Sequence, residues 1–166
     1  MKDRAFALGL GGNLGDVPGN LRRCVASLAA TPGVSSLKVA PIYETPPWGG
    51  VSGGNFLNTV VCGFWRGTDT GLLEVCRELE LQAGSRTDKN GGARTLDVDV
   101  LFLQGGVSTP ELTLPHPGIP RRRFVLVPLA DVWSEVIPGM GNTPAELLQS
   151  VEDDSSIIFR GSLEAD

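Results

Sequence analysis

The most regular hydrophobic pattern of the chain lies between residues 96 and 102, where every second position is apolar. These positions are Leu96, Val98, Val100 and Phe102. The pattern predicts a strand with one face packed on a core, which places Asp97 and Asp99 together on the other face. Alternate strand residues lie about 6.5–7 Å apart at Cα, so the two carboxylates can approach a common point.

The two carboxylates allow two interpretations. Anionic oxygen ligands suit Mg²⁺, which keeps several waters and completes its shell with substrate phosphates. Arg94, at the start of the strand, could hold the same phosphates. The alternative is a solvated strand face with two ordinary aspartates. This stretch alone leaves both interpretations open.

Three more strands are predicted, at 5–10, 37–43 and 56–65. One helix begins near Pro18 and ends before Pro32, and a second is capped by Asp69 or Thr70. Their apolar stripes are Leu21, Cys24, Val25 and Leu28 in the first, and Leu72, Leu73, Cys76 and Leu79 in the second. The resulting order is strand, helix, strand, strand, helix, strand. It predicts an α+β, ferredoxin-like split βαβ sandwich, with an antiparallel sheet and helices on one face.

Three segments fall outside these regular elements. Two long loops, 44–55 with Trp48 and 83–93 with Arg86, could surround one open site beside the aspartate strand. The Trp48 indole either contacts a ligand or folds back onto the domain. The glycine-rich segment 9–16 fits neither a phosphate loop nor a dinucleotide fingerprint, so we expect a tight turn there.

Four single residues invite a structural and a functional interpretation. Asn58 lies on an otherwise apolar strand face, so its amide must bond either to backbone or to a ligand edge. Glu80 comes near a helix C-terminus, where a carboxylate is disfavoured unless something holds it. His116 between two prolines is by itself a loop histidine, and Phe124 by itself is a core residue. One or two of the three arginines at 121–123 could reach an anion.

Composition bounds the class of protein. The chain has 166 residues, 41% of them apolar, and a net charge of -5. This predicts one soluble domain, 1–150, followed by an acidic and partly disordered tail, 151–166. The negative charge argues against nonspecific nucleic-acid or membrane binding. Three cysteines without a CxxC spacing predict buried thiols, and the lack of a long apolar run makes the cytoplasm the expected location.

Several motifs in a fixed order carry a resemblance to a known family. They are Gly11-Gly12-Asn13-Leu14-Gly15, Tyr43-Glu44-Thr45-Pro46-Pro47-Trp48-Gly49, Asn55-Phe56-Leu57-Asn58, Glu78-Leu79-Glu80, Arg94-Thr95-Leu96-Asp97-Val98-Asp99, and Leu114-Pro115-His116-Pro117 through Leu126. Over residues 5 to 150 the chain closely resembles the 6-hydroxymethyl-7,8-dihydropterin pyrophosphokinases of folate biosynthesis. The resemblance implies a ferredoxin-like fold and favours the metal interpretation of the aspartates. It also implies transfer of the β,γ-diphosphate of ATP to the pterin hydroxymethyl group, with release of AMP.

The resemblance further implies a role for each matching position. Asp97 and Asp99 would bind two Mg²⁺ ions. Residues that would hold the nucleotide and its phosphates are Glu80, Arg94, Val100, Thr113, His116 and Arg122. Arg86 would swing in late on its loop to stabilise charge, so that Arg86 and Arg94 join the two aspartates as catalytic residues. The pterin pocket would comprise Thr45, Pro46, Trp48, Phe56, Asn58 and Phe124. We expect a monomer whose partners are these small molecules.

The chain departs from the family in the loop before Arg94. Many members carry a tryptophan there, whereas this chain has Asn90-Gly91-Gly92-Ala93, which predicts a looser lid unless Trp48 compensates. Two rival functions remain. An RNA-recognition domain shares the topology but would need aromatic and basic residues where this sheet has aspartates. A degenerate member would bind pterin and ATP without transfer, although it would have no need of the metal pair.

Overall fold

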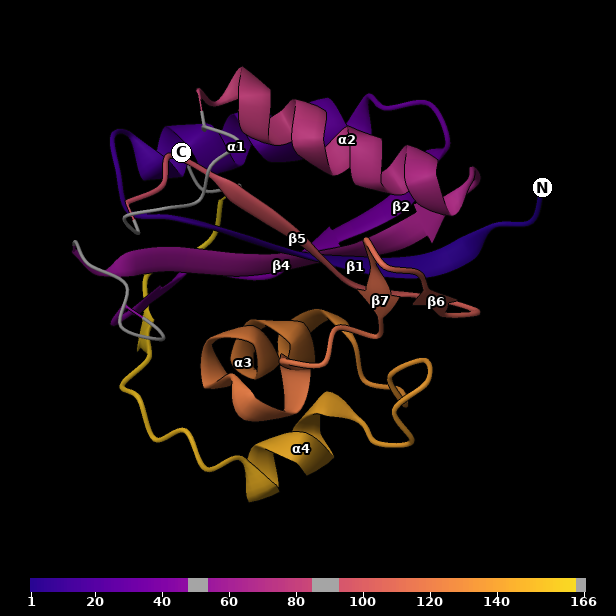
Figure 1. The fold of residues 1–166 in the computed structure, drawn as a ribbon. Coiled ribbons are helices and arrows are strands. Elements are labelled where there is room, and N and C mark those ends of the chain that lie inside the picture. Colours follow the sequence, from indigo (N-terminus) through magenta and orange to yellow (C-terminus); the bar gives the residue numbers. More distant parts are fainter. Residues whose placement is uncertain (48–53, 85–92, 164–166) are drawn as a thin grey trace.

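The computed structural model describes residues 1–47, 54–84 and 93–163. A six-stranded antiparallel sheet forms its centre, with helices on both faces (Figure 1). The strands are β1 (Arg4–Gly12), β2 (Val34–Val39), β3 (Tyr43–Thr45), β4 (Phe56–Trp65), β5 (Asp97–Leu103) and β8 (Ile158–Phe159). Their spatial order is β5-β1-β4-β3-β8, and β2 also pairs with β4. The predicted α+β sandwich and its element order are confirmed.

Two helices, α1 (Val17–Ala29) and α2 (Asp69–Gln82), cover one face of the sheet. Their buried residues include the predicted Leu21, Cys24 and Leu28 of α1 and Leu72, Cys76 and Leu79 of α2. Thr68 caps α2, because its Oγ1 accepts a hydrogen bond from the Gly71 amide at 3.0 Å. The cap therefore comes one residue before the earlier of the two predicted positions.

The opposite face is covered by α3 (Arg123–Val132), on which α4 (Pro144–Ser150) packs, so the prediction of helices on one face only is wrong. Leu126 and Leu129 of α3 belong to a second hydrophobic core, which is separate from the core beneath α1 and α2. A capping box between Thr143 and Glu146 begins α4. Short strands β6 (Val107–Ser108) and β7 (Thr113–Leu114) and a 3-10 helix (Ile119–Arg121) connect β5 to α3.

A β-bulge near the end of β5 changes the sheet face toward which the following side chains point. Leu8 of β1 pairs with Val100, but the preceding Ala7 pairs with Phe102, so Leu101 is the extra residue. Phe102 consequently packs in the core beneath α3, where its ring centroid lies 4.9 Å from that of Trp133. The prediction that Phe102 shares a face with Val98 and Val100 is therefore wrong.

The strand predicted at 37–43 is split in two. β2 ends at Val39 and β3 begins at Tyr43, with Pro41, which has no amide hydrogen, between them. The Ile42 amide then donates to the Gly161 carbonyl at 2.7 Å. The break thus directs this part of the chain toward the C-terminal segment.

The described part of the predicted acidic tail, 151–163, contacts the domain. β8 pairs antiparallel with β3, and Leu163 is buried in the core beneath α1 and α2. In Figure 1 this segment is the yellow trace that runs from α4 along the sheet to the layer of α1 and α2.

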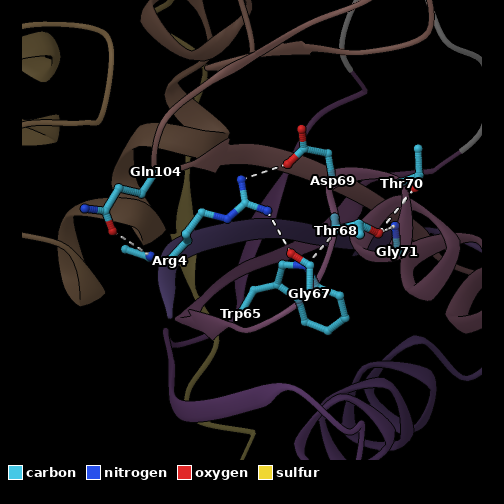
Figure 2. A network of polar contacts seen from close by, with 9 residues as sticks. Arg4, Trp65, Gly67, Thr68, Asp69, Thr70, Gly71 and Gln104 are labelled. Carbon is cyan, nitrogen blue, oxygen red and sulfur yellow. Dashed lines mark hydrogen bonds and ion pairs between the residues drawn. The ribbon is translucent and has the colours of Figure 1, made fainter. Parts of the chain in front are cut away.

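A polar network fixes the start of β1, at the end of this strand away from Gly11 (Figure 2). Arg4 forms an ion pair with Asp69 at 2.8 Å and donates to the Gly67 carbonyl at 2.9 Å. On its other side the Ala5 amide donates to the Gln104 Oε1 at 3.1 Å. The first turn of α2 and the end of β5 are thereby attached to the same strand.

The three cysteines are buried thiols, as predicted. Burial raises the pKa of the Cys24 and Cys62 thiols to about 12, which keeps both thiols protonated at neutral pH. Among the helices in the described ranges, none combines the length and apolar character needed to cross a bilayer.

Candidate active site

The two aspartates lie on β5 above bare backbone. In the β1–β5 pairing, Asp97 is opposite Gly11 and Asp99 is opposite Gly9, while Val98 points into the core beneath α1 and α2. Residues directly opposite each other share a sheet face, and glycine places no side chain there. The predicted common face of Asp97 and Asp99 is confirmed, and it is open next to the carboxylates.

Gly9 and Gly11 of β1 line the pocket beside the aspartates, a placement that the sequence interpretation missed. The predicted tight turn is wrong for 9–12, because β1 continues through Gly12. A Cβ at Gly11 would lie 2.2 Å from the Asn58 Oδ1, whereas a Cβ at Gly9 would meet Leu101 at an ordinary 3.6 Å. The sequence does indicate a strand face with small side chains, since every second residue from Ala5 to Gly11 is alanine or glycine.

A pocket of about 180 Å³ opens over this floor, between the sheet and the start of α3. It brings together nine of the predicted site residues: Thr45, Pro46, Phe56, Asn58, Asp97, Asp99, His116, Arg122 and Phe124. These residues are drawn from β3, β4, β5, α3 and the segment between β7 and α3. The pocket is therefore the point at which separate motifs of the sequence converge.

An amide and a hydroxyl form one wall of the pocket. The Asn58 Nδ2 donates to the Thr45 Oγ1 at 2.7 Å, and Thr45 is 2% exposed. Asn58 thus bonds to a side chain, which neither sequence interpretation anticipated, and its Oδ1 lies over Gly11. Phe124 packs against the core beneath α3, which confirms the structural interpretation, and it also lines the pocket, where contact with a pterin stays a prediction.

Arg94 lies beside the first aspartate. Its Nε is 3.3 Å from the Asp97 Oδ1, and the two side chains are 13% and 27% exposed. The Arg94 amide donates to the Asn13 Oδ1 at 2.7 Å, and the Arg94 carbonyl accepts from the Asn13 amide at 2.9 Å. The end of β1 therefore fixes the backbone that carries this guanidinium.

His116 and Arg122 are placed together by a glycine. The His116 Nδ1 accepts a hydrogen bond from the Gly118 amide at 2.9 Å, so in the neutral ring the proton is on Nε2. A Cβ at Gly118 would lie 2.8 Å from the Arg122 Nε and 3.0 Å from the His116 Cε1. Gly118 therefore allows both side chains to approach the pocket.

The His116 ring favours its neutral form. Burial is the largest cause of its lowered pKa, the charges of Arg122 and Arg121 add to the effect, and Asp99 opposes it. A neutral imidazole with its proton on Nε2 can donate a hydrogen bond to a ligand oxygen.

The lowered pKa predicts a pH dependence of stability. Between the folded-state pKa and 6.5, the unfolded chain binds a proton that the folded chain does not, so the free energy of unfolding falls as pH drops through this window. His116→Gln removes this loss, and His116 is the only histidine of the chain. In urea unfolding at about pH 7.5 and about pH 5.5, we expect the wild type to lose more stability than the variant. Equal losses would contradict the assignment.

Besides Arg94, three described residues of the predicted site do not line the pocket: Glu80, Val100 and Thr113. Glu80 accepts a hydrogen bond from the Val98 amide at 2.8 Å, so its carboxylate is held at the end of α2 and fixes β5 between the aspartates. The Val100 side chain lies in the core beneath α1 and α2, and Thr113 is exposed on β7. Trp48 and Arg86 lie outside the described residues.

The donor set fits Mg²⁺ that arrives with a phosphorylated ligand. Within the described ranges, no group of three or more His, Cys, Asp or Glu side chains forms a complete cage. Mg²⁺ is commonly bound by one or two carboxylates, with waters and phosphate oxygens as the other ligands. Asp97 and Asp99 supply these two carboxylates on an open face.

The fold and the pocket define an α+β protein in which an amide–hydroxyl wall and a pair of carboxylates line one opening. A family model described as 7,8-dihydro-6-hydroxymethylpterin-pyrophosphokinase (HPPK) matches residues 7–134. The chain belongs to this family.

Two bacterial relatives carry the name 2-amino-4-hydroxy-6-hydroxymethyldihydropteridine pyrophosphokinase. The protein of Methylorubrum extorquens is 41% identical over 150 residues, which cover 90% of this chain and 94% of the relative. The protein of Bacillus subtilis is 37% identical over 130 residues, 78% of each chain. A crystal structure of Plasmodium falciparum HPPK-DHPS matches 90% of this chain with a TM-score of 0.63. At 12% identity it shows the fold alone, and the match spans 45% of that longer chain.

Proposed function

We propose that this protein transfers the β,γ-diphosphate of ATP to the hydroxymethyl group of 6-hydroxymethyl-7,8-dihydropterin, which gives the pterin diphosphate and AMP in folate biosynthesis. The observation that carries the proposal is the convergence of the Asn58–Thr45 wall and the Asp97–Asp99 pair on one pocket. Membership of the pyrophosphokinase family supports the same reaction.

The pterin would occupy the part of the pocket between β3, β4 and α3. Asn58 and Thr45 offer an acceptor oxygen and a hydroxyl that can read the donor and acceptor edge of the ring. Phe56 and Phe124 provide apolar surface for its faces, and Pro46 continues the wall. Trp48 stays our prediction for an additional ring at this end.

The phosphates would lie on the other side, next to β5. Asp97 and Asp99 would hold Mg²⁺, and we propose two ions, the number that the resemblance to the pyrophosphokinase family implies. Bound there, the metal would neutralise phosphate charge and orient the oxygens. His116 would donate from Nε2, and Arg122 and Arg94 would contribute positive charge to the phosphate oxygens.

The remaining predicted residues belong to the nucleotide side. We propose that Glu80, Val100 and Thr113 lie near the nucleoside of ATP, and that Arg86 acts on the transferred group. The contribution of all these groups is to position two substrates and stabilise charge, which supplies most of the catalysis in phosphoryl transfer. A monomer in the cytoplasm also stays our prediction.

The test is incubation of the protein with ATP, Mg²⁺ and 6-hydroxymethyl-7,8-dihydropterin, with AMP measured by chromatography. We expect AMP and pterin diphosphate in equal amounts, and loss of both products in Asp97→Ala. Pterin binding without AMP would instead identify a degenerate binding module, an alternative that the comparisons do not support. The RNA-binding alternative is disfavoured because α3 covers the sheet face that would have to stack on bases.

A further inference from the structure

The C-terminal segment 151–163, which we call the C-terminal strap, lies beyond the part of the chain that matches the family model. It follows α4, reaches the start of α3 and then pairs with β3. These two elements carry residues on opposite sides of the proposed pterin site, Phe124 on α3 and Thr45 on β3.

At its first contact, the strap caps α3. Arg122 is the N-cap residue of this helix, and its side chain makes no capping hydrogen bond. The Arg123 amide donates instead to the Asp153 Oδ2 at 3.0 Å, and the Arg123 guanidinium donates to the Ser155 carbonyl at 3.2 Å. An acidic group at a helix N-terminus is favourable. The strap thus fixes the turn from which both Arg122 and Phe124 enter the pocket.

Asp153 is held in its ionised form. Partial burial would raise the pKa of its carboxyl, but the hydrogen bonds from Ser155 and from the Arg123 amide outweigh it, together with the Arg123 charge, and lower the pKa. The cap is therefore charged at the pH at which the enzyme would work.

At its second contact, the strap forms the outer neighbour of β3. Ile158 pairs with Glu44, and the Arg160 amide donates to the Ile42 carbonyl at 2.8 Å. The Arg160 guanidinium forms an ion pair with the Glu44 Oε1 at 2.8 Å. The other oxygen of Glu44 accepts from the Asn55 Nδ2 at 2.9 Å.

This second contact continues to the pocket. Glu44 is next to Thr45 in β3, and Asn55 is next to Phe56 in β4, and both Thr45 and Phe56 line the pocket. A separate bond from the Tyr43 hydroxyl to the Asp131 Oδ2 joins β3 to α3. The strap and this bond together connect β3, which carries Thr45, to α3, which carries Phe124. We call these two sides of the pocket the β3 wall and the α3 wall.

We propose that the C-terminal strap sets the spacing of the two pterin-binding walls, with Arg160 as a positioning residue for the β3 wall and Asp153 as a positioning residue for the α3 wall. The inference rests on the proposed function for the identity of the ligand. It assigns a part in substrate recognition to a segment that the family match does not include.

The two contacts make different predictions, because the two walls carry different groups. Arg160→Gln disturbs β3 and the start of β4, which carry pterin-side residues, so the KM for the pterin is expected to rise about fivefold, with no change in the KM for ATP. Asp153→Ala disturbs the helix that carries both Phe124 and Arg122, so both KM values are expected to rise about fivefold.

A matched control is Arg66→Gln. Arg66 forms an ion pair with Asp3 at 2.9 Å in an exposed position, and neither residue lines the pocket. We expect both KM values of this variant to equal those of the wild type. Thermal unfolding of all variants, and equilibrium binding of the pterin followed by its fluorescence, separate an effect on the walls from a loss of folded protein.

The outcomes distinguish the strap from the proposed function. A selective rise in the pterin KM and dissociation constant in Arg160→Gln supports the proposal. It is overturned if both KM values rise together in Arg160→Gln, or if neither rises, while the wild type forms AMP. Unchanged KM values in Asp153→Ala would overturn the part that concerns α3. A wild type that binds no pterin and forms no AMP would instead overturn the proposed function.

Discussion

Asp99→Asn is expected to lower the rate of AMP formation by about a hundredfold or more while the folded protein keeps its stability. The substitution removes a charge from the open face of the pocket and preserves the shape of the side chain. Loss of one preorganised group that stabilises the reacting charge typically costs about a hundredfold to a thousandfold in rate. Asp99 is exposed, so we expect the free energy of unfolding to change by less than about 0.5 kcal/mol.

Asp97→Asn is expected to lower both the rate of AMP formation and the free energy of unfolding, whereas Asp99→Asn is expected to lower only the rate. The same loss of activity is expected, because both carboxylates face the same opening. Asp97 also forms the ion pair with Arg94 at 3.3 Å, in which both side chains are mostly covered. We therefore expect this variant to lose about 1 kcal/mol of stability in addition.

The measurement is AMP release at saturating substrates, together with urea unfolding of the same preparations. Calorimetric titration with a non-hydrolysable ATP analogue, with and without Mg²⁺, adds a readout that needs no turnover. In Asp99→Asn we expect the Mg²⁺-dependent part of the affinity to fall. A variant that retained wild-type rates would exclude Asp99 from the metal site.

The spacing of apolar residues in the helices and their alternation in the strands predicted the fold well, because both patterns indicate which side chains of one element are buried. The stripe of α2 was correct at Leu72, Cys76 and Leu79, and the common face of Asp97 and Asp99 followed from alternation in β5. The motifs also identified most of the residues that converge on the pocket. Spacing along one element could not by itself show that these elements meet.

The errors occurred where contacts between distant segments decide the local structure. The bulge at Leu101 depends on pairing with Ala7 and Leu8, and the apolar run from Val100 to Leu103 does not by itself place it. The strap has few core-forming residues, yet it is fixed by backbone pairing with β3 and by polar contacts such as Asp153 to Arg123. Hydrogen bonds of this kind do not appear in the spacing of apolar residues along the sequence.

Glycine patterns are similarly ambiguous. A run rich in glycine is more typical of a turn than of a strand, which is why Gly9, Gly11 and Gly12 were assigned to a turn. In β1, Gly11 and Gly12 are needed because other groups occupy the space where a side chain would be. A Cβ at Gly12 would lie 2.7 Å from the Thr95 carbonyl oxygen, and one at Gly11 would overlap the Asn58 amide.

Gly11→Ala is consequently expected to impair pterin binding selectively. The new Cβ would lie 2.2 Å from the Asn58 Oδ1 and 3.3 Å from the Leu57 carbonyl oxygen, so the Asn58 side chain must move. Its hydrogen bond to Thr45, at 2.7 Å, would then be lost or distorted. Loss of such a partly buried hydrogen bond corresponds to about 1–3 kcal/mol, or about fivefold to 150-fold in the KM for the pterin. The KM for ATP should change much less.

Two comparisons make the Gly11 prediction specific to the contact with Asn58. Gly9→Ala adds a methyl group to the same face of the same strand, but this group would meet Leu101 at 3.6 Å, so a smaller effect is expected. In an Asn58→Ala background, Gly11→Ala should add almost nothing, because the side chain that it displaces is absent. The pterin KM of the four proteins in this double-mutant cycle measures the coupling. If the two substitutions were additive, Gly11 would act through the backbone of β4 rather than through the amide.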